Sequence, residues 1–419
     1  MHLYALPMCF VLIGLVLYTV LGGADFGAGI WQLTAGRGPD AERLRDHAHK
    51  SIGPVWEANH VWLIFVLTVT WTAYPTAFGS IASTLSVALF LAALGIIFRG
   101  ATYALRTGAE TGREARVIDT VFALSSLLTP FALGAAVGGI ASRRVPVGNA
   151  AGHLFSSWLN PTSVLIGALA VVSAAYLAAV FLAADAVRAG DSELERRFRL
   201  RALLAGAVAG ALAVAGLIVV HSDAPELYHP LVSGDGLPAL VVSALAGIGT
   251  LALVWRRRYE PARYSAAVAV AAIIAGWALA QEPVLLPGLT IQQAAAPHDT
   301  LVVVVVAVLA GGALLFPSLA LLFRLVLGGH LGAHGAEGAA GAGAAAPAAP
   351  TPSTLIAAVG SGFAARAAVA CLVTGIGLLT LADARWAHAI GAVALLAVVV
   401  LGFVAVGPAE LAAREGEAG

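Results

Sequence analysis

The sequence predicts an all-α polytopic membrane protein, and three observations support this fold class. Of the 419 residues, 60% are hydrophobic and only 11% are charged, whereas soluble domains carry about 25% charged residues. The mean hydropathy is +0.90. The charges that remain are clustered and leave long uncharged runs. A helix of about 20 apolar residues crosses a hydrocarbon layer ~30 Å thick, so runs of this length predict membrane spans.

Nine uncharged intervals before residue 328 are long enough to be spans. They are the stretch before Asp25, two spans between Ala58 and Phe98, the interval between Asp119 and Arg143, the stretch before Asp185, and the intervals 201–223, 235–256, 263–282 and 299–324. Tyr74 and Pro75 divide the second span from the third, because proline cannot continue a helix without losing a hydrogen bond. We therefore expect a nine-helix membrane domain over residues 1–327.

The C-terminal region has a different composition. Residues 328–352 are rich in Gly, Ala and Pro, which is typical of a flexible linker. Two further apolar stretches near 363–382 and 386–406 predict an extra transmembrane hairpin with a short tail within 353–419.

The charges are balanced in number but not in position. Lys and Arg total 23, as do Asp and Glu, so the chain lacks the basic excess of a nucleic-acid-binding protein. Basic residues concentrate in alternate loops, around 37–50, 99–116, 188–201 and 256–263, whereas the opposite loops hold Arg143, Arg144 and Arg385. Because short basic loops stay in the cytoplasm, we expect the N-terminus outside and the C-terminus in the cytoplasm.

Two carboxylates fall inside predicted spans. Asp25 stands in a glycine-rich segment of the first span, and Glu57 stands near the start of the second. A charged residue at the centre of a membrane helix costs roughly 2.5–3.5 kcal/mol on insertion scales. The loop between the two spans is expected to be cytoplasmic, so both acids should lie in the cytoplasmic half of adjacent antiparallel helices.

Buried carboxylates at this depth suit a proton path. Asn59 and His60 lie beside Glu57 and one turn along the helix, so these four residues form the predicted path: Asp25, Glu57, Asn59 and His60. Gly23, Gly27, Trp56 and Trp62 are expected to support it, since glycines allow close helix packing. In the alternative interpretation, the acids reach interfacial water or pair with Arg37, Arg45 or Lys50.

A metal site is disfavoured by the sequence. Glu57 and His60 have the Glu-x-x-His spacing of di-iron bundles, but such sites need a second copy and further carboxylates. Cys9 and Cys371 lie in predicted spans, so no cysteine metal site or disulfide framework is available. A haem would need an intramembrane ligand such as His60, and no second histidine stands at a comparable depth.

The segments around both acids resemble subunit II of cytochrome bd-type quinol oxidases. Residues 23–29 (GADFGAG) and 52–64 (IGPVWEANHVWLI) carry the resemblance, together with Phe98-Arg99, Pro130 and Leu159-Asn160-Pro161. The resemblance is strong to about residue 165, continues weakly to about residue 328, and is absent from the last two helices.

The resemblance implies a specific role. Such enzymes oxidise quinol in the bacterial cytoplasmic (inner) membrane and reduce dioxygen to water with protons from the cytoplasm. Subunit I holds haem b, haem d and the quinol site. Subunit II has two four-helix bundles plus a peripheral helix, binds no haem, has no catalytic residue of its own and supports assembly. A small accessory subunit often accompanies the pair.

The family's acidic pair matches Asp25 and Glu57, with three departures. Gly22 stands where the family often has another acid, Glu57 where it often has Asp, and His60 where it often has Gln. Two other classes of function use the same residues differently. A proton-coupled transporter would couple the acids to substrate movement, although neither segment has the second copy expected of transporter repeats. In an assembly scaffold the acids would be structural.

Overall fold

The computed structural model describes residues 2–36, 38, 42–45, 47–48, 56–105 and 112–327, with isolated positions between 367 and 397. Two compact units are present, Met1–Ala320 and Leu321–Gly419, and the description below concerns the first. The expected linker at 328–352 and most of the expected hairpin lie outside the described residues. The division into a membrane domain, a linker and a hairpin therefore stays a prediction.

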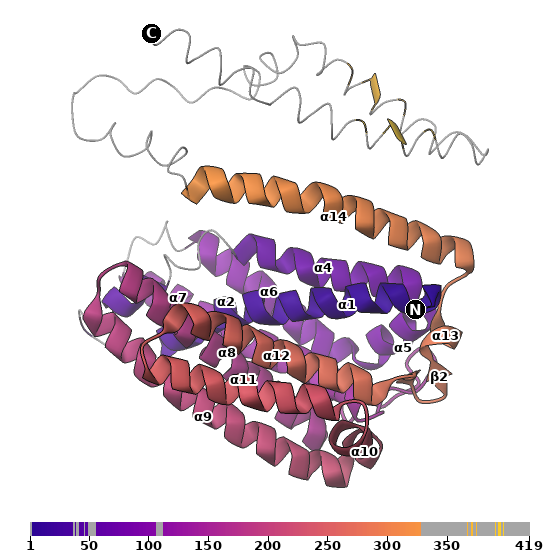
Figure 1. Cartoon of the computed structure of the whole chain (residues 1–419), viewed down its shortest axis with the longest axis horizontal. Helices are drawn as coiled ribbons and strands as arrows, with labels where there is room; N and C mark the ends of the chain where they lie inside the picture. The colour runs from indigo at the N-terminus through magenta and orange to yellow at the C-terminus, as the bar shows by residue number, and fades with distance from the viewer. Residues whose placement is uncertain are drawn as a thin grey trace. The chain divides into compact units, whose positions relative to one another are not determined.

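The described part of the chain is built almost entirely from helices (Figure 1), which confirms the all-α fold class. A two-stranded hairpin, β1 (Val284–Leu286) and β2 (Leu289–Thr290), is the exception among the described residues. The helical elements are η1 (Leu3–Ala5), α1 (Leu6–Leu17), the π-helix η2 (Tyr18–Gly22), α2 (Gly23–Leu33), α4 (Trp56–Ala73), α5 (Pro75–Thr84), α6 (Ser86–Leu105), α7 (Gly112–Ala141), α8 (Pro161–Arg188), α9 (Ser192–Asp223), α10 (Pro225–Ser233), α11 (Leu237–Trp255), α12 (Tyr259–Gln281), α13 (Ile291–Ala294) and α14 (His298–Leu327).

The predicted spans correspond to these helices. Within the described residues, seven helical stretches are long and apolar enough to cross a membrane, and two shorter apolar helices, Asn59–Ala73 and His298–Ala313, occupy the remaining predicted positions. The break at Tyr74 is confirmed, since α4 ends at Ala73 and α5 begins at Pro75. The sequence did not predict a second interruption at Leu85, which separates α5 from α6.

Helix α8 forms the centre of the helix packing. Its alanine-rich segment between Tyr176 and Ala186 is buried against α2, α9 and α12 in the largest hydrophobic cluster. Alanine has a small side chain, so neighbouring helices can approach closely. Helices α8, α9, α11 and α12 contact one another in one group, whereas α2, α6 and α7 belong to a second group that joins the first through α8. Val304 of α14 packs on Val11 and Val69 at the edge.

Two contacts bring three of the basic loops to one end of these helices. Arg43 pairs with Asp191 in the α8–α9 turn at 2.6 Å, and Arg188 pairs with Glu260 at the start of α12 at 3.1 Å. The grouping of the loops around 37–50, 188–201 and 256–263 is therefore confirmed. One assignment was wrong, because Arg99 is a buried residue of α6 and not a loop residue. The uncharged segment after Arg99 continues the helix to Leu105.

Candidate functional site

A buried ion pair between Asp25 of α2 and Arg99 of α6 forms the centre of the site. The side chains are 4% and 1% exposed, and Arg99 Nη2 lies 2.5 Å from Asp25 Oδ1. The same nitrogen donates to the Asp25 carbonyl at 3.0 Å, while Nη1 donates to Ser126 Oγ on α7. The guanidinium also lies over the rings of Phe26 and Phe122, at 5.0 and 4.3 Å from their centroids. Arg99 therefore links three helices through one side chain.

Glycines on α2 make this close approach possible. A Cβ atom at Gly29 would stand 2.2 Å from Ser126 Oγ and 2.9 Å from Arg99 Nη1. On another side of the helix, a Cβ at Gly27 would stand 1.9 Å from the carbonyl oxygen of Ala174 on α8. Both distances are below van der Waals contact, so a side chain at either position would push α2 away from its neighbours. The glycine-rich segment thus positions Asp25 against α6, α7 and α8.

A π-helical segment, η2, leads into Asp25 and meets α4. It spans Tyr18–Gly22 and directly precedes α2. Single π-helical turns of this kind occur frequently at functional sites because the extra residue changes the helix register. Asn59 Nδ2 donates to the Leu21 carbonyl at 3.3 Å, so α4 is joined to the π-helical segment itself.

Asn59 and His60 were predicted to belong to the path because they follow Glu57 closely in the sequence. In the structure they lie close to the Asp25 segment. The His60 ring centroid is 6.2 Å from that of Tyr18 and 6.3 Å from that of Phe26. Asn59 is 1% exposed. The structure therefore brings these two residues of α4 against η2 and α2, as the antiparallel arrangement predicted.

The remaining residues of the predicted path and its support are Trp62, Gly23, Trp56 and Glu57. Trp62 packs partly buried against the cluster that contains Phe26. A Cβ at Gly23 would stand 3.1 Å from Leu177 Cδ1, a looser fit than at the other two glycines. Trp56 and Glu57 belong to the first turn of α4, but their side chains lie outside the described residues. A contact between Glu57 and Asp25 therefore stays a prediction.

Several polar atoms around the pair are buried and have no hydrogen-bond partner among the described residues. They are Tyr18 Oη, Asp25 Oδ2, Asn59 Oδ1 and Arg99 Nε, with Gln32 Nε2 nearer the end of α2. Gln32 follows Asp25 by seven residues, about two turns, so it lies on the same helix face toward the basic loops. Buried polar atoms are normally satisfied by protein or by ordered water. This cluster therefore suits a hydrated polar path through the helices.

Among the described residues, Asp25 pairs with Arg99, which the sequence did not suggest as a partner. Arg45 donates to the Gly36 carbonyl at 2.7 Å, while Arg37 and Lys50 lie outside the described residues. Arg99 and Ser126 were the residues that sequence reasoning missed. A signal for Arg99 was present, since it stands inside an otherwise uncharged stretch that continues to Leu105. Ser126 carries no such signal, because serine is common in membrane helices.

Metal-binding groups were predicted to be absent, and only the described residues can be compared with that prediction. The described residues contain no group of three His, Cys, Asp or Glu side chains that could hold a metal. The half-buried His60 ring lies near two aromatic rings, those of Tyr18 and Phe26. An apolar groove on α6, α7 and α8, with a volume of ≈ 760 Å³, has no His, Cys, Met or Tyr in its lining.

Comparison with known proteins identifies the family. A family model described as cytochrome bd terminal oxidase subunit II matches residues 3–326. The chain is 20% identical to a putative cytochrome bd menaquinol oxidase subunit II of Bacillus subtilis over 55% of this chain and 67% of that protein. It is 27% identical to the cytochrome bd-I ubiquinol oxidase subunit 2 of Escherichia coli over 50% of this chain and 56% of that protein. The chain thus spans little more than half the length of some curated relatives.

A solved structure gives a broader match. The structure of bd oxidase from Geobacillus thermodenitrificans is similar with a TM-score of 0.63 and 27% identity. The match covers 78% of this chain and 99% of the chain in that structure. The helix arrangement described above is therefore shared along the whole of a bd oxidase chain.

Proposed function

Because the chain belongs to the cytochrome bd terminal oxidase subunit II family, we propose that it works as subunit II of a membrane quinol oxidase that reduces dioxygen to water. Membership implies haem cofactors in the complex, a subunit I partner and a quinol substrate. The finer assignment is that subunit I holds haem b and haem d, as the resemblance to bd-type oxidases implies. Because the chain belongs to an oxidase family, a proton-coupled transporter is not needed to explain the two acids.

Within the complex, this chain conducts protons from the face that carries the basic loops. That face is cytoplasmic, because short Arg-rich loops remain on the cytoplasmic side, and the N-terminus is then outside. The single observation that supports the path is the cluster of buried polar atoms around Asp25. Arg99 engages Oδ1 and the Asp25 carbonyl, which leaves Oδ2 as the carboxylate atom able to bind water and accept a proton. Gln32 lies on the basic-loop side of Asp25, while Asn59, His60 and Tyr18 surround it.

Glu57 is the acid of the proposed path that lies nearer the basic-loop face. It stands in the first turn of α4, two residues before Asn59, at the end of the helix that adjoins the basic loop. Arg99 is a positioning residue in this scheme, since it fixes the rotamer of Asp25 and does not itself exchange a proton. The remaining function of the chain is to support assembly of the haem-bearing subunit.

The experiment must separate proton transfer from structural loss. Asp25→Asn alone leaves a buried, uncompensated Arg99, which costs about 3–5 kcal/mol and endangers assembly. The double variant Asp25→Asn/Arg99→Gln removes both charges, so neither side chain is left as an uncompensated buried charge. We expect it to recover haem content, measured from the absorbance spectrum of the complex purified through this chain, while quinol-dependent oxygen uptake stays low.

A matched control is available on the neighbouring helices. Asp185→Asn/Arg263→Gln neutralises a pair with the same 2.5 Å separation outside the proposed path, and we expect its turnover per haem to be normal. Glu57→Gln tests the second acid of the path in the same assay. Normal turnover in the Asp25→Asn/Arg99→Gln complex would show that the acid is structural, as in the scaffold alternative.

A further inference from the structure

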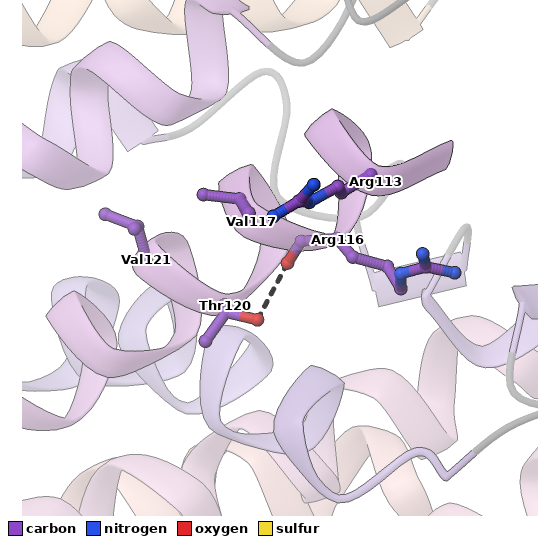
Figure 2. A pocket seen from close by; sticks show the side chains of 5 residues that line it. All are labelled: Arg113, Arg116, Val117, Thr120 and Val121. Carbon is purple, nitrogen blue, oxygen red and sulfur yellow. Dashed lines mark hydrogen bonds between the residues drawn. The ribbon is translucent and has the colours of Figure 1, made fainter. Parts of the chain in front are cut away.

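A groove on the outward face of α7 carries two arginines at one end. The first part, of ≈ 440 Å³, is lined by Arg113, Arg116, Val117, Thr120 and Val121, and Figure 2 shows these five side chains. The second part is the apolar groove of ≈ 760 Å³ between α6, α7 and α8. Val121 lines both parts, so they adjoin along one face of the helix.

The lining of the second part is apolar except for Ser125. It includes Phe98 of α6, Leu124 and Phe131 of α7, and Val171 of α8. Phe98 and Leu124 are 50% and 55% exposed. This face of α7 is opposite to the face on which Phe122 and Ser126 contact Arg99. The groove is therefore separate from the proposed proton path.

The dimensions of the groove correspond to one leaflet of a bilayer. Val121 and Phe131 are ten residues apart, about 15 Å along a helix, which is half of a hydrocarbon core ~30 Å thick. Arg116 stands roughly 7.5 Å beyond Val121 and Arg113 one turn further. An acyl chain lying against Val121 and Phe131 thus has its headgroup at the level of the two guanidinium groups.

The polar end of the groove favours an anion. Arg113 and Arg116 are both exposed, and among the described residues neither forms an ion pair. Thr120 Oγ1 donates to the Arg116 carbonyl at 2.7 Å, the dashed line in Figure 2, so the hydroxyl hydrogen is already engaged. Glu114 and Asp119 belong to the same turns but do not line the groove. The available donors are therefore two guanidinium groups, which bind phosphate oxygens in pairs.

We propose that this groove binds one anionic phospholipid of the leaflet at the basic-loop end. The phosphate of the headgroup lies between Arg113 and Arg116, and one acyl chain follows the apolar groove past Leu124 to Phe131. A neutral quinone ring or a zwitterionic headgroup binds the two arginines less strongly, because only a net negative charge is attracted to both.

The test uses the full-length chain, purified in detergent within the complex that it forms. Native mass spectrometry measures binding of phosphatidylglycerol and phosphatidylcholine. The wild type is expected to retain phosphatidylglycerol preferentially. Arg113→Gln/Arg116→Gln is expected to weaken phosphatidylglycerol binding about ten-fold or more, as for two surface arginines near an anionic lipid, and to leave phosphatidylcholine unchanged. Ala168→Phe fills the groove and is expected to weaken both lipids.

The matched control is Arg256→Gln/Arg258→Gln, which removes the same charge from exposed positions at the same end of the helices. It is expected to change neither lipid. The proposal is overturned if this control lowers phosphatidylglycerol binding as much as the groove variant does. It is equally overturned if the wild type shows no preference between the two lipids, or if Ala168→Phe releases a bound quinone and leaves phosphatidylglycerol binding unchanged.

Discussion

Two Asp–Arg pairs in this protein have nearly the same contact geometry but different surroundings. In each, an arginine Nη2 lies 2.5 Å from an aspartate Oδ1 and also 3.0 Å from a backbone carbonyl oxygen of the aspartate's helix. Each guanidinium also lies about 5 Å from a phenylalanine ring, Phe26 for Arg99 and Phe181 for Arg263. The local contact therefore does not distinguish the two pairs.

Burial and additional charges do distinguish them. The Arg99 and Asp25 side chains are 1% and 4% exposed, whereas those of Arg263 and Asp185 are 15% and 25% exposed. Asp185 also lies 3.3 Å from Arg188, and Arg263 lies 3.7 Å from Glu260. The second pair is thus one part of a network at helix ends, where water and neighbouring charges can replace a lost partner. Among the residues that the structure describes, Asp25 and Arg99 have no ionic partner other than each other.

The largest expected effect of a single change is at Arg99. Arg99→Gln leaves Asp25 buried without its cation, and we expect the complex to lose about 3–5 kcal/mol of stability. Thermal unfolding followed by haem absorbance measures the loss. Surface ion pairs contribute up to about 1 kcal/mol. A loss of stability smaller than this in Arg99→Gln would contradict the distinction between the buried pair and the pair at the helix ends.

The close approach of the helices at the buried pair gives the next effect. In Gly29→Ala, the added Cβ would meet Ser126 Oγ at 2.2 Å, and overpacking of this kind destabilises by about 1–3 kcal/mol. Gly210→Ala in α9 is the control, since nothing lies within 4 Å of its Cβ position. Alanine favours helix over glycine by roughly 1 kcal/mol, so the control is expected to be neutral or stabilising in the same thermal assay.

A smaller effect is expected for the pair at the helix ends. Arg263→Gln should lower the stability of the complex by about 1 kcal/mol, because Arg188 still lies near Asp185. Unfolding curves recorded at low and at high salt measure this, and salt should reduce the difference from wild type. The effect of Arg99→Gln should change little with salt. Equal salt dependence of the two variants would contradict the assignment of one pair to the interior.

The smallest expected effect concerns Asp191, outside the spans. The hydrogen bond from the Leu194 backbone N–H, with the nearby Arg43 guanidinium, holds the pKa of Asp191 below its ordinary value. A lowered pKa means that the ionised form stabilises the folded state at neutral pH, and this contribution is lost as the pH falls through the folded-state value. We expect Asp191→Ala to lower the melting temperature slightly at pH 7. The difference from wild type should shrink below about pH 3.9, the ordinary aspartate pKa, and a difference that grows in acid would contradict this.

The two pairs also show how far a sequence can identify a site. Asp25 was identifiable because a lone carboxylate in an apolar helix has a large free-energy cost that needs an explanation. Arg99 was predicted to lie in a loop because it stands near other arginines in the sequence. Only the structure shows that it is buried in α6 and pairs with Asp25. Asp185 and Arg263 marked the ends of predicted spans, which is where both occur.

By itself, the sequence determined the helical membrane class, the positions of the spans up to residue 327, the grouping of three basic loops and the location of Asp25 inside a span. These properties follow from local composition, because the length of an apolar run and the position of a charge along it are independent of distant residues. Only the tertiary structure decided that Arg99 and Ser126 meet Asp25, that Gly27 and Gly29 allow the approach, and that α7 carries a groove on its outer face. Those contacts depend on the distances between helices and on their rotation, which are fixed by side chains far apart in the chain.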